Sequence, residues 1–232
     1  MVFFNLKNNK LAYILNIETA TKNCSVALAK DGVVIICKEI AEEGFSHAEK
    51  LHLFIEDCIK EADVTLQDLS AVAVSQGPGS YTGLRIGVSA AKGLCFALSI
   101  PLIAIDTLQS LASQAHVADG VIIPMIDARR MEVYSAVFSA EGERLREVQA
   151  EIITEDSFSD YEEKVYFVGD CAEKCSTLLT NSNFVFLVEF KYPSANEMAQ
   201  LSFEKYKKND TVDVAYFEPY YLKDFMITTS KK

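Results

Sequence analysis

The sequence predicts an α/β protein with two lobes, each a mixed β-sheet flanked by helices. A chain of 232 residues with 50% hydrophobic content is long enough for two small domains, each with its own core. The two halves of the chain share a weak internal pattern, and each half continues with alternating helices and strands. We place the boundary at residue 105, so that the lobes span residues 1–105 and 106–232.

The internal pattern is a strand that ends in a carboxylate, followed by a polar turn and by a hairpin that an acidic residue and a glycine close. In the first half the strand ends at Glu18 and the hairpin turns at residues 31–32. In the second half the strand ends at Asp127 and the hairpin turns at residues 141–142. We expect both carboxylates to face the cleft between the lobes.

A first helix is expected to begin at Ser46, because Glu49 completes a capping box three residues later. His47 lies at the edge of the apolar stripe of this helix. A contact with another protein and a hydrogen-bonded buried histidine are both compatible with that position. The stripe follows three- and four-residue spacing and contains Leu51, Phe54, Ile55, Cys58, Ile59 and Ala62.

A glycine-rich turn over residues 77–87 is the most distinctive segment, and it leads into a helix expected over residues 82–98. Ser80 or Thr82 is the expected N-cap. Glycine inside a helix costs about 0.8–1 kcal/mol relative to alanine, so the small residues of this helix require a close contact. That contact is with the protein's own sheet or with a second helix. The small residues are Gly83, Gly87, Ala90, Ala91 and Gly93.

The C-terminal part of the sequence predicts one more helix and a returning tail. The helix begins at Ser194, with Glu197 three residues later as a second capping box, and its role is structural. The tail around residues 219–222 is expected to pack back on the first lobe, near the cleft.

Composition excludes several classes of function. A formal net charge of −11 and dispersed basic residues argue against direct, tight binding of nucleic acid. No apolar run approaches the ~20 residues that cross a bilayer, and residues 1–10 lack the features of a secretory signal. We therefore expect a cytoplasmic protein without membrane contact.

The six cysteines are scattered, and the closest pair is Cys171 and Cys175, spaced Cys-x-x-x-Cys. We interpret the cysteines as reduced core residues. A metal or redox role for Cys171 and Cys175 is the alternative.

Glu18, Thr19 and Asp127 are candidates for a nucleotide cleft, because carboxylates at such strand ends can organise a metal-bound nucleotide or act as a base. The turn over residues 19–23 has no glycine through which a phosphate could approach the backbone. The chain also contains no Walker-type Gly-Lys-Ser/Thr run. A capping or solvated carboxylate is therefore the favoured interpretation of Glu18.

The glycine-rich turn resembles the signature of the bacterial TsaB family, also called YeaZ, and more loosely that of the paralogous TsaD family. The resemblance implies two ribonuclease-H-like lobes of the acetate kinase, Hsp70 and actin superfamily. Residues 1–10 and 151–164 lie outside it. The matching segments are residues 14–21, 25–28, 77–87, 91–94, 101–108, 126–134 and 219–223.

TsaD-like enzymes carry a His-x-x-x-His metal pair after the strand that corresponds to residues 101–105. At the matching positions this sequence has Thr107 and Leu111, and neither side chain replaces a histidine ligand. We therefore predict no metal, no catalytic residue and no cofactor in the isolated chain. The resemblance leaves ATP or ADP open for an assembled complex.

The resemblance implies a non-catalytic partner of TsaD, which transfers a threonylcarbamoyl group to the adenosine beside the anticodon of tRNAs that read codons beginning with A. It also implies that the ATPase TsaE joins the assembly, that tRNA contacts are indirect and that the isolated chain can form a homodimer. In the family, the contact with TsaD uses two helices of the first lobe. Gly87→Leu is therefore expected to fold normally and to lose its binding to TsaD. The expected interface is His47, Leu51, Phe54, Ile55, Gly83, Arg85, Gly87, Ala90 and Ala91.

Two other classes stay open. An ATP-dependent small-molecule phosphotransferase of the same superfamily would use Glu18 or Asp127 to organise a metal, and tight Mg-ATP binding by the isolated chain would favour it. A peptidase would need an activated serine. Pro78 stands where a nucleophile elbow around Ser80 requires glycine, so the sequence argues against this class.

Overall fold

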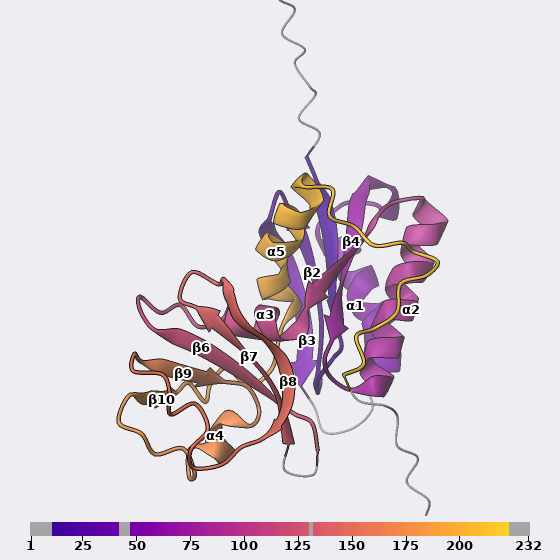
Figure 1. Cartoon of the computed structure of the whole chain (residues 1–232). Helices are drawn as coiled ribbons and strands as arrows, with labels where there is room; N and C mark the ends of the chain where they lie inside the picture. Colours follow the sequence, from indigo (N-terminus) through magenta and orange to yellow (C-terminus); the bar gives the residue numbers. More distant parts are fainter. Residues whose placement is uncertain (1–10, 42–46, 130–131, 223–232) are drawn as a thin grey trace, which may run out of the picture.

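A computed structural model describes residues 11–41, 47–129 and 132–222. They form two lobes, each built around one five-stranded sheet (Figure 1). The expected helix start at Ser46 lies outside these ranges. Within them, no helix combines the length and the apolar character that crossing a membrane requires.

The first sheet has the strand order β3-β2-β1-β4-β5. β1 pairs in parallel with β4, and β4 with β5, whereas β2 is antiparallel to both β1 and β3. Asp31 and Gly32 close the hairpin between β2 and β3 with positive φ, as the acidic-glycine pattern predicts. The strands are β1 (Tyr13–Glu18), β2 (Asn23–Lys30), β3 (Val33–Ala41), β4 (Leu69–Gly77) and β5 (Leu102–Asp106).

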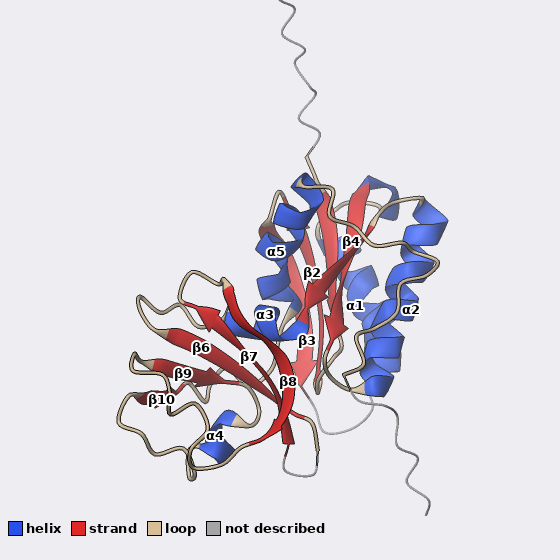
Figure 2. Ribbon diagram, viewed as in Figure 1, coloured by secondary structure: helices blue, strands red, loops and turns tan. Residues whose placement is uncertain are grey.

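Different helices cover the two faces of the first sheet (Figure 2). Leu15 and Ile17 of β1 belong to a core shared with α1 (His47–Glu61) and α2 (Tyr81–Leu98). Ile14 lies on the opposite face by strand alternation, and it packs with α5 (Ala195–Lys207). A 3₁₀ turn, η1 (Leu66–Asp68), leads from α1 into β4.

The second sheet repeats the strand order of the first. Read from β8, the order is β8-β7-β6-β9-β10, so β6 takes the central position that β1 holds in the first lobe. This repeat confirms the predicted fold class of two mixed sheets flanked by helices. The strands are β6 (Val121–Asp127), β7 (Glu132–Ser139), β8 (Arg144–Ile152), β9 (Val165–Val168) and β10 (Phe184–Phe186).

Two short helices cover the second sheet, one on each face. α3 (Thr107–Ala112) packs through Leu108 and Leu111 against Ile122 on one face. α4 (Ala172–Cys175) packs on the other face together with Ile123. Each lobe therefore has its own core, divided by its own sheet.

α5 lies on the first lobe, although the predicted boundary places all residues from 106 to 232 in the second lobe. Ala195 and Met198 of α5 fill the face of the first sheet that α1 and α2 leave open. Ser194 is the N-cap and accepts a hydrogen bond from the Asn196 N–H at 3.1 Å. The predicted capping box is not formed, because Glu197 accepts from the Asn196 side chain instead.

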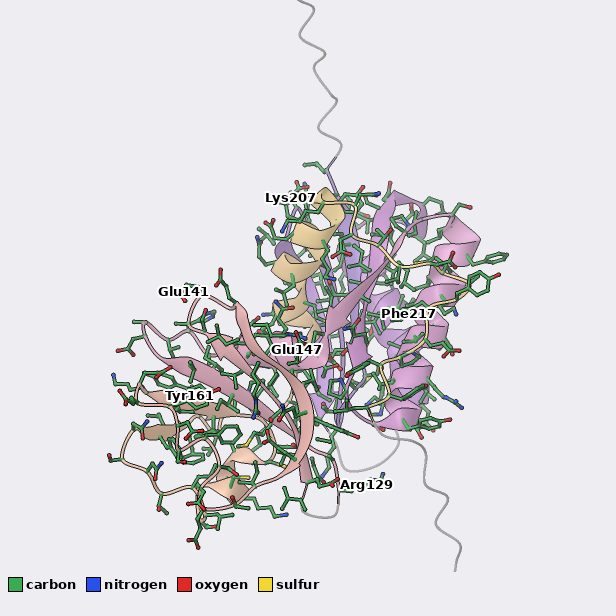
Figure 3. All side chains as sticks on the ribbon, in the orientation of Figure 1. Arg129, Glu141, Glu147, Tyr161, Lys207 and Phe217 are labelled. Carbon is green, nitrogen blue, oxygen red and sulfur yellow. The ribbon has the colours of Figure 1, made fainter. Side chains whose placement is uncertain are left out.

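The residues after α5 also lie on the first lobe. The tail crosses β4 and then runs along α2 (Figure 1). Phe217 of this tail, labelled in Figure 3, packs on the first core. The chain thus leaves the first lobe after β5 and returns to it at Ser194.

Polar contacts join the two lobes. Arg144 of β8 forms an ion pair with Asp106 at 2.9 Å, and the other oxygen of Asp106 caps α3 by accepting from the Gln109 N–H at 2.9 Å. The Asp106 side chain is only 6% exposed, so this pair is largely removed from water. We expect it to fix the orientation of β8 against the end of β5.

Candidate functional site

The glycine-rich turn connects β4 to α2. Ser80 is the N-cap of α2, and its hydroxyl accepts from the Gly83 N–H at 3.3 Å, which settles the choice between Ser80 and Thr82. Gly77 has a φ of +112°, a region that favours glycine. A Cβ at Gly77 would also lie 2.7 Å from the backbone oxygen of Tyr220 in the returning tail.

Gly83 and Gly87 pack against the protein's own chain, so their assignment to a partner interface is wrong. A Cβ on Gly83 would meet the carbonyl oxygen of Thr19 well inside 3.0 Å, and a Cβ on Gly87 would meet the Thr19 hydroxyl equally closely. The Thr19 hydroxyl donates to the Gly83 carbonyl oxygen at 2.8 Å. These two glycines let α2 approach the end of β1. The lack of space at Gly87 also argues against the expectation that Gly87→Leu folds normally.

Three more of the expected interface residues lie in the interior. His47 is 8% exposed, and its Nε2 lies 2.9 Å from the Thr21 carbonyl oxygen. It is therefore a hydrogen-bonded buried histidine. Leu51 and Ala91 are fully buried in the first core. Their side chains hold α1 and α2 on the sheet and are not available to another protein.

The outer sides of α1 and α2 enclose a groove of about 830 Å³. Arg85 and Ala90 line it, as does Ile55, which is only 7% exposed and belongs to the first core, whereas Phe54 is half-buried against that core. Gly93 also lines the groove, and a Cβ there would meet nothing within 4 Å. The lining is Ala48, His52, Ile55, Tyr81, Thr82, Arg85, Ile86, Ser89, Ala90, Gly93 and Leu94.

Exposed apolar surface continues beyond the groove along α2. Phe96 is 84% exposed and lies one helical turn after Gly93. Leu53 on α1 is 53% exposed. Large exposed apolar side chains on the helices that form a groove are typical of surfaces that bind other proteins.

Glu18 and Asp127 occupy unlike environments although they end equivalent strands. Glu18 is fully buried; its Oε1 accepts from the Ala20 N–H at 2.6 Å, and its Oε2 has no hydrogen-bond partner in the described structure. Burial raises the pKa of Glu18 from 4.5 to about 7, and polar contacts with Ser75 and the backbone oppose the shift. Asp127 is exposed, so water reaches this carboxylate but not that of Glu18.

The end of β1 is closed by the glycine-rich turn. A Cβ on Gly79 would collide with the Ala20 carbonyl oxygen, and Thr19 lies directly beneath Gly83 and Gly87.

Asp170 is a half-buried carboxylate of the second lobe that was not predicted from the sequence. It accepts a hydrogen bond from the Asp127 N–H at 3.0 Å, and burial raises its pKa. Asp170 follows β9, at the end equivalent to the glycine-rich turn, and strand order could have identified it.

The positions that match the metal-binding histidine pair hold buried, packed side chains in this chain. Thr107 is fully buried, and its hydroxyl lies 2.5 Å from the Ser75 hydroxyl and accepts from the Gly77 N–H at 3.0 Å. Leu111 is fully buried in the core beneath the second sheet. Among the described residues no group of three or more His, Cys, Asp or Glu has metal-binding geometry.

Cys171 and Cys175 are free thiols buried in the second core. Burial raises the pKa of both, that of Cys171 to about 12. A thiol with so high a pKa is almost fully protonated at neutral pH, which disfavours both metal binding and nucleophilic attack.

The comparisons with known proteins agree with the fold. The model of a family described as TsaD, tRNA N6-adenosine threonylcarbamoyltransferase, matches residues 39–228. The chain is 31% identical over 220 residues to tRNA threonylcarbamoyladenosine biosynthesis protein TsaB of Escherichia coli (strain K12), covering 91% of this chain and 94% of that protein. The structure of YeaZ from Pseudomonas aeruginosa superposes with a TM-score of 0.80 and 25% identity, covering 91% of this chain and all of that chain.

A match to the tRNA N6-adenosine threonylcarbamoyltransferase of Bacillus subtilis (strain 168) is shorter: 30% identity over 136 residues, which cover 52% of this chain and 39% of that enzyme. The repeated sheet order and these matches define a two-lobed protein of the group that includes the threonylcarbamoyltransferases. Within that group the chain belongs to the TsaB family, as its full-length relatives show.

Proposed function

We propose that this chain is a non-catalytic subunit of tRNA threonylcarbamoyladenosine biosynthesis that binds and activates a TsaD-type transferase. The role in this biosynthesis is supported by the name of a relative that matches over 91% of the chain. The transferase as partner is supported by the family model and by the family resemblance, which implies a contact through the first-lobe helices. The modified base on this proposal is the adenosine beside the anticodon.

The groove between α1 and α2 is the observation that carries the proposal. Its apolar lining and the small residues Ala48, Ala90 and Gly93 suit the close approach of a helix from another protein. Figure 1 shows α1 and α2 side by side on the outer face of the first lobe, away from the second sheet. We therefore assign the transferase helix to this groove.

Several features favour a subunit without its own chemistry. Thr107 and Leu111 are packed into the interior at the positions of the TsaD metal pair. Glu18 is buried beneath the glycine-rich turn, which argues against a phosphotransferase that uses it to organise a metal. The net charge of −11 argues that tRNA is held by the transferase. TsaE, a homodimer of the isolated chain and ATP or ADP in the assembly remain proposals from the resemblance.

A reconstituted modification assay tests the proposal. Purified TsaD-type transferase, TsaE, the threonylcarbamoyl-adenylate donor and tRNA are incubated with and without this chain, and the modified nucleoside is measured by mass spectrometry. We expect modification only when the chain is present. Equal modification without the chain, or transfer by the chain alone, would overturn the assigned role.

A further inference from the structure

The C-terminal tail is fastened to the first lobe at several points. We call residues 210–222 the strap. Near its start, the Val212 N–H donates to the Leu102 carbonyl oxygen at 2.9 Å, and near its end the Tyr220 N–H donates to the Gln76 carbonyl oxygen at 2.7 Å. Between these points, Lys92 of α2 donates to the carbonyl oxygens of Ala215 and Phe217, both at 3.0 Å. The strap is thereby held against the outer side of α2.

At the end of the described strap, Tyr221 contacts two residues of the groove, Arg85 and Tyr81. The Tyr221 hydroxyl accepts from the Nε–H of Arg85 at 3.2 Å. The guanidinium carbon of Arg85 lies 4.0 Å from the centre of the Tyr81 ring and 6.0 Å from that of Tyr221. The two rings are 5.1 Å apart. The Arg85 guanidinium thus lies over the ring of Tyr81 on its own helix, which contacts the ring of Tyr221, and the Tyr221 hydroxyl from the strap holds the Arg85 Nε–H.

This arrangement leaves the outer edge of the guanidinium free to bind. Arg85 is exposed, and none of the ion pairs among the described residues involves it. Glu218 of the strap influences Arg85 only through space. Among the described residues that line the groove, Arg85 alone carries a permanent positive charge. The fork of N–H groups in arginine matches a carboxylate in a bidentate geometry.

We propose that the strap is a positioning device, in which Tyr221 and Tyr81 hold Arg85 ready to receive an Asp or Glu carboxylate on the docking helix of the partner. This inference rests on the proposed function, because it assigns a contact to the same groove. Arginine loses much rotamer freedom when it binds, and a side chain that is already held loses less. Tyr221 therefore strengthens docking without touching the partner's carboxylate.

Calorimetric titration of the full chain with the purified TsaD-type transferase tests the inference. Arg85→Ala should weaken binding by about 30-fold or more, because it leaves a partner carboxylate unpaired at a buried interface. Tyr221→Phe removes only the hydroxyl and should weaken binding about fivefold. In the Arg85→Ala background, Tyr221→Phe should have no further effect, since it acts through Arg85. Tyr216→Phe, on the exposed outer side of the strap, is the matched control and should bind like the wild type.

The outcomes separate this inference from the proposed function. A wild-type dissociation constant for Tyr221→Phe, or an equal loss with and without Arg85, overturns the positioning role. Full-strength binding by Arg85→Ala overturns the carboxylate contact. Gly93→Leu, which fills the groove, tests the docking surface itself. If Gly93→Leu binds normally, the proposed surface fails, whereas loss of binding in Gly93→Leu alone leaves the surface intact and refutes only the strap.

Discussion

Gly83 and Gly93 lie on different faces of α2, and replacing each with alanine should change stability in opposite directions. At Gly83 the new methyl group would overlap the Thr19 carbonyl oxygen, a backbone atom that moves only if β1 or α2 moves. Such overpacking costs about 1–3 kcal/mol, and a shift of α2 would also strain the hydrogen bond from Thr19 to Gly83, worth about 1 kcal/mol. The higher helix propensity of alanine offsets about 1 kcal/mol of this cost. We expect a net loss of about 1–3 kcal/mol for Gly83→Ala.

At Gly93 the same substitution meets open space. Only the gain in helix propensity remains, so Gly93→Ala should raise the free energy of unfolding by about 0.8–1 kcal/mol. For a protein of this size, each kcal/mol corresponds to about 2–4 °C in Tm. The two variants differ by the same methyl group, so each is the control of the other.

Urea denaturation followed by circular dichroism measures both variants against the wild type. From the most to the least stable, the expected order is Gly93→Ala, wild type and Gly83→Ala. If Gly83→Ala is as stable as the wild type, the close packing of α2 on β1 is refuted. If Gly93→Ala is strongly destabilised, the outward direction of Gly93 is refuted.

Two further predictions concern buried charges. Because burial raises the pKa of Glu18 from 4.5 to about 7, the unfolded chain releases this proton at lower pH than the folded protein. The free energy of unfolding should therefore fall between about pH 4.5 and 7, by about 3 kcal/mol from this group. In urea titrations Glu18→Gln should be more stable than the wild type at pH 8, and this difference in the free energy of unfolding should be much smaller at pH 5. An equal difference at both pH values would contradict the raised pKa of Glu18. Arg144→Met leaves Asp106 unpaired and should cost about 1–3 kcal/mol, whereas Glu147→Gln, which removes the exposed partner of Arg144, should change stability by less than about 0.5 kcal/mol. Equal effects of these two substitutions would show that the inter-lobe ion pair is no stronger than a surface pair.

The sequence predicts the fold class because the signals that define it are local and repeated. A carboxylate-ended strand and an acidic-glycine hairpin occur in both halves, and each half forms the same strand order. The returning α5 could not be assigned to the first lobe from sequence, because its apolar stripe fits either sheet. Only the assembled first sheet, with one face left open by α1 and α2, determines where α5 packs.

The size of the small residues on α2 does not indicate which of them face the sheet and which face the solvent. Gly87 lies between Leu84, Val88 and Ala91, which are buried, so the periodicity of the large residues was the better signal for its direction. Gly93 falls outside that buried stripe, and the same periodicity could have placed it outward. The contact of Tyr221 with Arg85 joins residues that are 136 positions apart, and no local pattern encodes it.

Binding of Gly93→Leu to the TsaD-type transferase shows whether a helix of the transferase docks in the groove between α1 and α2. A leucine at this position has room for its Cβ, so the variant should fold with wild-type circular dichroism and at least wild-type Tm, while its side chain fills the groove. Ala97→Leu is the matched control, because Ala97 is exposed on the same helix and does not line the groove. In calorimetry, we expect loss of binding for Gly93→Leu and normal binding for Ala97→Leu. A wild-type dissociation constant for a folded Gly93→Leu variant would contradict docking of the transferase in this groove.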